Sequence, residues 1–160
     1  HPKEIDLSLD RVKNLFKKLG NPQKDLKYIS VVGTNGKYST IQALRAILKE
    51  ANIKCNIYTS PHIQRINERF IFNDEEISDT DLSDLLVKVE EVNNGEEITY
   101  FEILTAAYFF HASKYRENIN IAFDGDFNFD ELLTELIGRS RYGFERIADH
   151  SKPEYPYSGQ

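Results

Sequence analysis

Cysteine, methionine and tryptophan are nearly absent from this sequence, which has one cysteine and none of the other two. Because Cys55 stands alone, the chain can form neither an internal disulfide nor a cysteine-rich zinc site, as is typical of proteins from the reducing cytoplasm. No stretch approaches the roughly 18 apolar residues of a membrane span and no signal peptide is visible, so we expect no membrane partner. A chain that begins at His1 and has no methionine is also expected to be trimmed, engineered or a fragment.

Basic residues are scarce too, at 20 Lys and Arg against 26 Asp and Glu, which leaves a net charge of -6. A general nucleic-acid surface needs clustered Lys and Arg, so we expect no nucleic-acid partner, and any bound anion must be held locally. With 160 residues, 40% of them apolar, the chain can bury one good core, and its length favours a single domain. The sequence gives no oligomeric state.

One stretch, residues 28–40 with the sequence YISVVGTNGKYST, organises the chain. An apolar run precedes two glycines and a lysine, and hydroxyl residues follow, which predicts a strand, a phosphate-binding loop and the start of a helix. The N–H groups at that helix start and the charge of Lys37 suit a triphosphate. The common P-loop template would need glycine at Val31 and a hydroxyl at Tyr38, so this loop is a variant. The alternative is a strand–helix turn that binds nothing.

Hydrophobic periodicity predicts alternating helices and strands along the rest of the chain. We expect helices over residues 7–19, 41–51, 79–92, 99–114 and 130–137, and strands over residues 28–32, 54–58 and 119–123. Residues 69–77 predict a hairpin with Asn73 and Asp74 at its turn, and Ser78 or Asp79 is expected to cap the following helix.

This order of elements predicts a three-layer α/β fold of the P-loop NTPase type with a mostly parallel sheet. The strand over residues 28–32 is expected to be buried and to form a parallel βαβ unit with residues 54–58. Three parallel strands are only part of such a sheet, so the fold is expected to be truncated. The polar tail after residue 138 is expected to be poorly ordered.

Four stretches have the residues, order and spacing of one known family. They are IDLSLDRV at 5–12, GTNGKYST at 33–40, YTSPH at 58–62 with NER at 67–69, and TYFE at 99–102. Together they resemble the bifunctional dihydrofolate synthase and folylpolyglutamate synthase enzymes, relatives of the Mur ligases. The resemblance covers residues 5 to about 121 and implies the N-terminal part of an ATP-binding domain. It implies an ATP- and Mg²⁺-dependent ligase that joins L-glutamate to dihydropteroate or folate through an acyl phosphate.

The resemblance also implies a role for each motif. Ser60 would bind Mg²⁺, in place of the hydroxyl that the loop lacks after Lys37, and Lys37 would be catalytic. Phe101 could stack on a pterin ring, and a carboxylate such as Asp6 could accept ring N–H bonds. The implied nucleotide-binding residues are Gly33, Thr34, Asn35, Gly36, Lys37, Ser39 and Thr40, and the implied substrate-binding residues are Asp6, Leu7, Ser8, Leu9, Thr99, Tyr100, Phe101 and Glu102.

Without the family match, each of these residues has a simpler interpretation. Ser60 is then an ordinary loop serine, Phe101 a core aromatic residue and Glu102 an acid at a helix N-terminus. Arg69 could bind an anion, although arginines in hairpins are usually solvated. His111, in an apolar helix, is expected to be a core residue with its hydrogen bonds satisfied.

The sequence departs from the family in two places. Tyr38 stands where the family has glycine, so its ring could crowd the nucleotide or stack beside it. After residues 119–123 the family continues with a glutamate that binds Mg²⁺, and here only Asp124 or Asp126 could replace it. We therefore expect two segments, residues 1–121 as the ATP-binding part and residues 122–160 as a divergent C-terminal segment.

Two other functions fit parts of the pattern. A small P-loop kinase would need an arginine-rich lid, for which the sequence offers Arg139, Arg141 and Arg146. A degenerate nucleotide-binding or interaction module would keep the fold without the metal carboxylate. Phosphate release measured with and without glutamate separates both from a ligase.

Overall fold

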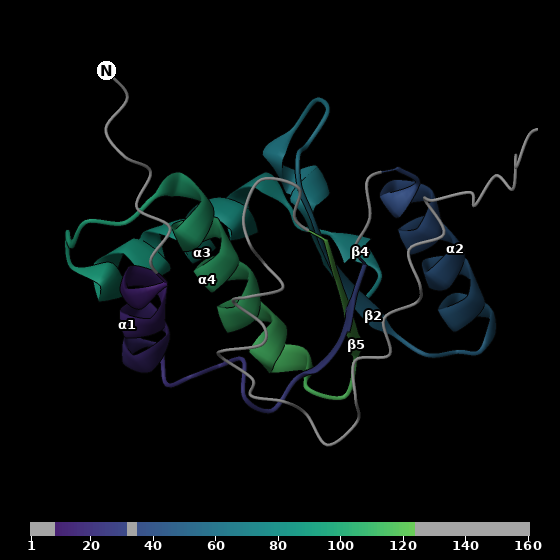
Figure 1. Ribbon diagram of the computed structural model, residues 1–160, viewed down its shortest axis with the longest axis horizontal. Coiled ribbons are helices and arrows are strands. Elements are labelled where there is room, and N and C mark those ends of the chain that lie inside the picture. Colours follow the sequence, from purple (N-terminus) through teal and green to yellow (C-terminus); the bar gives the residue numbers. More distant parts are fainter. Residues whose placement is uncertain (1–8, 32–34, 124–160) are drawn as a thin grey trace, which may run out of the picture.

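A five-stranded sheet in the order β1-β5-β2-β3-β4 forms the middle of the protein (Figure 1). The computed structural model describes residues 9–31 and 35–123. The parallel strands are β1 (Lys27–Ser30), β5 (Ile119–Phe123) and β2 (Cys55–Thr59), and the antiparallel hairpin strands are β3 (Phe70–Phe72) and β4 (Glu75–Glu76). The predicted α/β fold with a mostly parallel sheet is confirmed.

The position of β5 corrects one part of the prediction. β1 and β2 are parallel to one another as expected, but each pairs with β5, which lies between them. β1 is therefore an edge strand of the described sheet, and its residues are exposed or half-buried. The prediction of a buried strand is wrong here because only one side of β1 has a neighbouring strand within the described residues.

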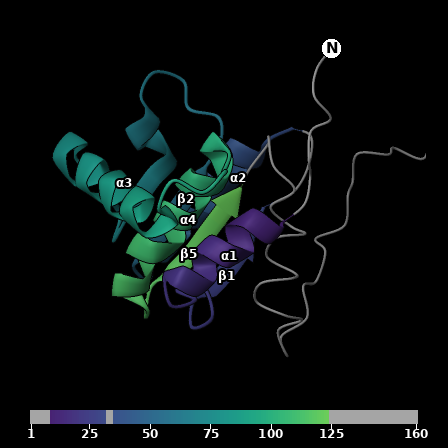
Figure 2. The same ribbon diagram turned by 90° about the vertical axis from the view of Figure 1, so that its left-hand side faces the viewer.

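Helices cover both faces of the sheet (Figures 1 and 2). On one face, α1 (Asp10–Lys18), α3 (Asp79–Asn93) and α4 (Tyr100–Ala112) pack against one another, and α2 (Lys37–Glu50) covers the opposite face. Side chains alternate along the strands, so Tyr58 and Ala122 join the core beneath the three helices, whereas Ile57 and Ile121 pack in the core next to α2. The predicted three layers are present.

Local signals fix where several elements begin and end. Ser78 caps α3, because its Oγ accepts a hydrogen bond from Asp81 N at 3.1 Å. Asn73 and Asp74 have φ angles of 53° and 71°, the left-handed backbone that a two-residue hairpin turn requires. Asn94, also left-handed, ends α3. The predicted cap, hairpin and helix end are confirmed.

α4 is buried along most of its length, as its uniformly apolar sequence predicts. Tyr108 in its middle stacks on Tyr58 from β2, with ring centroids 5.0 Å apart, and on Phe72 from β3, with centroids 5.5 Å apart. His111 is half-buried beside Phe72, at 4.4 Å between ring centroids, and burial lowers its pKa to about 4. The chain leaves α4 through a short 3-10 turn, Ser113–Tyr115, and enters β5.

The helix predicted over residues 130–137 and the predicted poorly ordered tail lie outside the described residues. Among the helices of the described part, none has the length and apolar character needed to cross a membrane. The described architecture therefore ends with β5, which lies between β1 and β2 in the sheet.

Candidate functional site

The strands that precede three of the segments implied in ligand binding end at one edge of the sheet. Because β1, β2 and β5 are parallel, their C-terminal ends share that edge. The phosphate-loop stretch follows β1, Ser60 directly follows β2, and Asp124 directly follows β5 in the sequence. In open α/β sheets, ligands bind at the carboxyl ends of the strands. The topology thus places the candidate site on this edge.

The start of α2 is suited to an anion. Gly36 precedes the helix with a φ angle of 77°, in the left-handed region that favours glycine. Lys37 is the first helical residue, and no acidic residue lies in the first turn. The hydroxyl of Thr40 donates to the carbonyl oxygen of Gly36 at 3.0 Å, which fixes the helix entry. The first-turn N–H groups lack intrahelical acceptors and can donate to a phosphate.

Only part of the predicted nucleotide loop is described, since Gly33 and Thr34 lie outside the described residues. The described loop and helix residues are exposed (Asn35, Gly36, Ser39, Thr40), apart from half-buried Lys37. Tyr38, at the position where the family has glycine, keeps 61% of its surface exposed. Its ring therefore contributes no core packing, and the phosphate contacts of the loop stay predictions.

Ser60, the predicted metal ligand, is fully buried and hydrogen-bonded to a buried arginine. Arg69 Nη1 donates to Ser60 Oγ at 3.1 Å, and Arg69 Nε donates to His62 Nδ1 at 2.9 Å. The second bond requires His62 Nδ1 to be unprotonated. Arg69 is 3% exposed, so the expectation of a solvated hairpin arginine is wrong. The reason is that Arg69 closes a 3-10 turn, Ile66–Arg69, that faces the Ser60 turn.

The N-terminus of α4 contains a buried carboxylate with one oxygen unpaired. Glu102, 1% exposed, forms a capping box with Thr99, because Thr99 N donates to Glu102 Oε2 at 2.7 Å and Glu102 N donates to Thr99 Oγ1 at 3.2 Å. Arg11 Nε from α1 also donates to Oε2, at 3.2 Å. Glu102 Oε1 has no hydrogen-bond partner among the described residues, although it is buried. Buried polar atoms without a hydrogen bond are rare in native proteins, so Oε1 is a candidate acceptor for a donor group of a ligand.

Arg69 connects the Ser60 turn to the start of α4. Its guanidinium carbon lies 5.8 Å from the ring centroid of Phe101, a cation–π distance. Tyr100 contacts the same ring edge-on, with centroids 5.6 Å apart. The structure therefore brings Ser60 and Phe101 together through one guanidinium.

The first family motif, which contains the implied substrate-binding residues Asp6 to Leu9, contacts the start of α4 through Arg11 and Glu102. Leu9, just before α1, is only 6% exposed and belongs to the core beneath α1, α3 and α4. The other members of that N-terminal segment, Asp6, Leu7 and Ser8, lie outside the described residues. Their contacts with a substrate stay predictions.

The described residues fit one Mg²⁺ ligand but no complete protein metal cage. No group of three or more His, Cys, Asp or Glu side chains in the described ranges could hold a metal ion. Magnesium commonly takes one or two protein oxygens and completes its shell with water and phosphate, so a single hydroxyl from Ser60 is chemically compatible. Asp124 lies outside the described residues.

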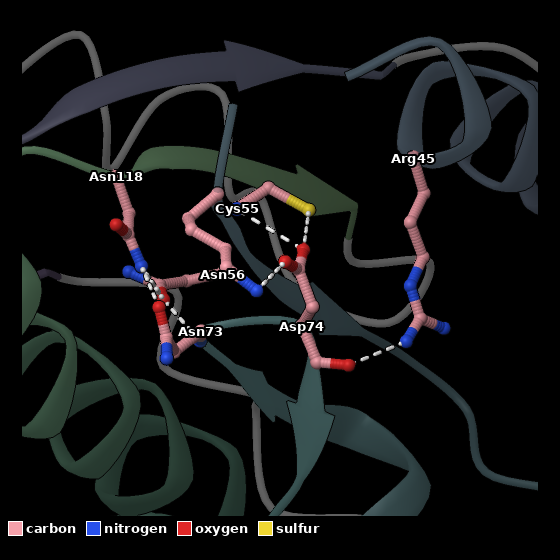
Figure 3. A network of polar contacts seen from close by, with 7 residues as sticks. Arg45, Cys55, Asn56, Asn73, Asp74 and Asn118 are labelled. Atoms are coloured by element: carbon pink, nitrogen blue, oxygen red, sulfur yellow. Dashed lines mark hydrogen bonds and ion pairs between the residues drawn. The ribbon is translucent and has the colours of Figure 1, made fainter. Parts of the chain in front are cut away.

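A second polar cluster lies at the opposite end of β2, around the hairpin turn (Figure 3). The Asp74 carboxylate accepts hydrogen bonds from Cys55 N and Cys55 Sγ, both at 3.2 Å, and forms an ion pair with Lys54 at 3.0 Å. Arg45 donates a hydrogen bond to the backbone carbonyl oxygen of Asp74 at 2.7 Å. Burial first, and then the bond to Asp74, raise the pKa of the Cys55 thiol to about 12. Burial alone would raise the pKa of Asp74, but the bonds from Lys54 and Cys55 lower it. This cluster joins α2 to the hairpin and has a structural role.

Sequence reasoning missed two features of the site. It gave Arg69 two alternative roles, as an anion-binding residue or as a solvated side chain, and it assigned no role to Arg11. Arg11 and Glu102 are 91 residues apart in the sequence. The available signal was the position of Arg11 at the end of the first family motif.

Comparison with known proteins places these observations in context. No family profile matches the chain. It is 35% identical over 139 residues to the dihydrofolate synthase/folylpolyglutamate synthase of Bacillus subtilis, a match that covers 81% of this chain and 32% of the relative. It is 30% identical over 107 residues to the dihydrofolate synthetase of Saccharomyces cerevisiae, covering 66% of this chain and 25% of the relative.

Solved structures give the same result. The bifunctional folylpolyglutamate synthase/dihydrofolate synthase of Yersinia pestis, complexed with AMPPNP and Mn ion, matches with a TM-score of 0.69 and 31% identity over 78% of this chain and 30% of that one. Escherichia coli FolC in complex with DHPP and ADP matches with a TM-score of 0.68 and 30% identity over the same shares. The chain thus spans a quarter to a third of the length of these relatives, and the resemblance stated from its motifs is confirmed.

Proposed function

We propose, from the premise that this chain belongs to the dihydrofolate synthase/folylpolyglutamate synthase family, that it binds ATP, Mg²⁺ and a pterin-containing acid for an ATP-dependent glutamate ligase. The acid would be dihydropteroate or folate, and the amine would be L-glutamate. In this proposal residues 1–121 form part of the ATP-binding domain, and residues 122–160 are a divergent segment. A cytoplasmic protein of this kind fits the single, buried cysteine.

The observation that carries the proposal is the unpaired carboxylate oxygen of Glu102. Burying a charged oxygen without a hydrogen bond is costly, so a site that does so is prepared for a donor. A pterin offers several ring N–H groups in one plane. Phe101, the adjacent residue, presents an aromatic ring on which a flat heterocycle could stack.

The phosphate end of the proposed site lies at the start of α2. There, first-turn N–H groups and Lys37 would hold the nucleotide phosphates. Ser60 would hold Mg²⁺, and the ion, when bound, would neutralise charge on the transferring phosphoryl group. Tyr38 is exposed, so its ring can turn aside from a bound nucleotide.

The proposed reaction has two steps. A carboxylate oxygen of the acid bonds to the γ-phosphorus of ATP, the bond from that phosphorus to ADP breaks, and an acyl phosphate results. The amine nitrogen of glutamate then bonds to the acyl carbon, the carbon–oxygen bond breaks, phosphate leaves and the amine loses a proton. The residues of this chain would contribute by orienting the acid and by supplying positive charge at the phosphates.

Titration calorimetry on the 160-residue chain tests the binding claims. We expect heat from ATP–Mg²⁺ and, separately, from dihydropteroate. Lys37→Ala should weaken ATP binding by a factor of about 10 or more, because it removes one charge-assisted contact, and should leave dihydropteroate binding unchanged. Folded protein that binds neither ligand would contradict the proposal. ATP turnover that is independent of glutamate would favour a kinase instead.

A further inference from the structure

Arg69 is a buried cation without a counter-ion among the described residues. It is 3% exposed, and no described acidic side chain forms an ion pair with it. Arg11, a half-buried cation near the start of α4, differs in that it pairs with Glu102. Burying an unpaired charge costs several kcal/mol in general, so such a group needs either a ligand or a functional reason.

The hydrogen bonds of Arg69 leave part of its guanidinium available. Of the five N–H donors of a guanidinium, one on Nε bonds to His62 Nδ1 and one on Nη1 bonds to Ser60 Oγ. Both acceptors are neutral, and the Phe101 ring at 5.8 Å supplies only a cation–π contact. The other three donors have no acceptor within residues 9–31 and 35–123, and they have the fork geometry that matches a carboxylate or phosphate.

The neighbours of Arg69 indicate which anion it takes. Ser60 stands at the proposed metal and phosphate side, and Phe101 stands at the proposed pterin side, beside Glu102. A ligand group that touches Arg69 would therefore lie between the two ends of the site. In the proposed reaction, the group in that position is the carboxylate that receives the phosphoryl group.

We propose that Arg69 binds the carboxylate of the acid substrate and holds it next to Ser60. The inference rests on the proposed function and goes beyond it, because it assigns the reacting carboxylate to one side chain. His62 and Ser60 orient the guanidinium through their hydrogen bonds, so its remaining donors keep a fixed direction. A residue that only braced the Ser60 turn would need no buried positive charge.

A ligand-coupling experiment tests this assignment. The affinity of the 160-residue chain is measured for dihydropteroate and for the analogue in which hydrogen replaces the benzoate carboxylate. The variants are Arg69→Gln, Arg69→Lys and, as a matched control from the same turn, exposed Arg65→Gln. We expect wild-type protein to favour the carboxylate ligand by a factor of about 10 to 100, the usual contribution of a charge-assisted hydrogen bond.

In Arg69→Gln that preference should disappear, because the carboxylate loses its partner, while affinity for the analogue changes little. Arg69→Lys should keep part of the preference, and Arg65→Gln should keep all of it. Equal losses for both ligands in Arg69→Gln would overturn the inference and leave the proposed function standing. If Arg69→Gln does not fold, the comparison of wild-type protein with Arg69→Lys tests the inference. Wild-type protein that binds both ligands with equal affinity also overturns the inference. Wild-type protein that binds neither ligand overturns both proposals.

Discussion

Glu102→Ala should destabilise the protein by more than its place in the first turn of a helix would suggest. Glu102 Oε2 accepts the Thr99 N–H bond at 2.7 Å, and losing such a cap costs about 1 kcal/mol. The same oxygen pairs with Arg11 at 3.2 Å, and this partly buried contact contributes about 1 to 2 kcal/mol more.

One effect acts in the opposite direction. Glu102 Oε1 is buried without a hydrogen-bond partner in the described part of the chain, and removing it relieves a desolvation cost of about 1 kcal/mol. The sum is a loss of about 1 to 2 kcal/mol in the free energy of unfolding. Glu102→Gln should lose less, about 1 kcal/mol, because its amide oxygen can still accept the Thr99 N–H bond while the ion pair is removed.

Urea unfolding followed by far-ultraviolet circular dichroism measures these differences. Glu96→Ala serves as the control, since Glu96 also pairs with a cation from α1, Lys18 at 2.7 Å, but does so at the exposed surface. We expect its midpoint to move little, as is usual for exposed ion pairs. A Glu102→Ala midpoint equal to that of Glu96→Ala would refute the reasoning from burial and capping.

Three further predictions follow from individual residues. Burial lowers the pKa of His111 to about 4, so as the pH falls the unfolded protein takes up a proton on this side chain before the folded protein does. The free energy of unfolding should therefore drop by about 1 kcal/mol between pH 7.5 and 5.5. His111→Gln should abolish this pH dependence, and an unchanged pH dependence in the variant would contradict the lowered pKa. Burial and the bond to Asp74 raise the pKa of Cys55 to about 12. Native protein should therefore react with a thiol reagent at least about 100-fold more slowly than protein in denaturant. Equal reaction rates would exclude a buried thiol. Gly36 has a φ angle of 77°, so Gly36→Ala should cost about 1 kcal/mol in urea unfolding, compared with little for exposed Ser39→Ala.

Local sequence signals predicted most of the elements because they act over a few residues. The hairpin turn at Asn73 and Asp74, the Ser78 cap and the apolar helix that became α4 each depend on neighbours within one or two turns. The phosphate-loop pattern likewise predicted a helix directly after the loop, opened by the hydroxyl residues Ser39 and Thr40; α2 begins slightly earlier, at Lys37.

Long-range pairing was the part that the sequence could not give. Nothing in residues 27–30 or 55–59 indicates that a strand some 60 residues further along will lie between them, so β1 was predicted buried and is an edge strand of the described sheet. Strand order depends on how whole faces are covered, which periodicity along one segment does not report.

The candidate site shows the same limit. Its motifs could be recognised individually, but the burial of Arg69 arises from Ser60, His62 and Phe101 meeting in space. A lone arginine before a hairpin has no sequence signal that separates this environment from solvent. The family resemblance indicated which motifs form the site, and only three-dimensional packing showed that Arg69 is buried without an acidic partner among the described residues.

The position of β5 between β1 and β2 has a consequence for the order in which the protein can form on the ribosome. Until Phe123 has left the exit tunnel, β1 and the β2–β3–β4 hairpin unit have no strand to join them, and their inward-facing edges remain open. Open strand edges on a nascent chain are sites of mispairing and chaperone binding. The protein should therefore gain protease resistance abruptly, when synthesis passes this strand, rather than gradually as each helix emerges.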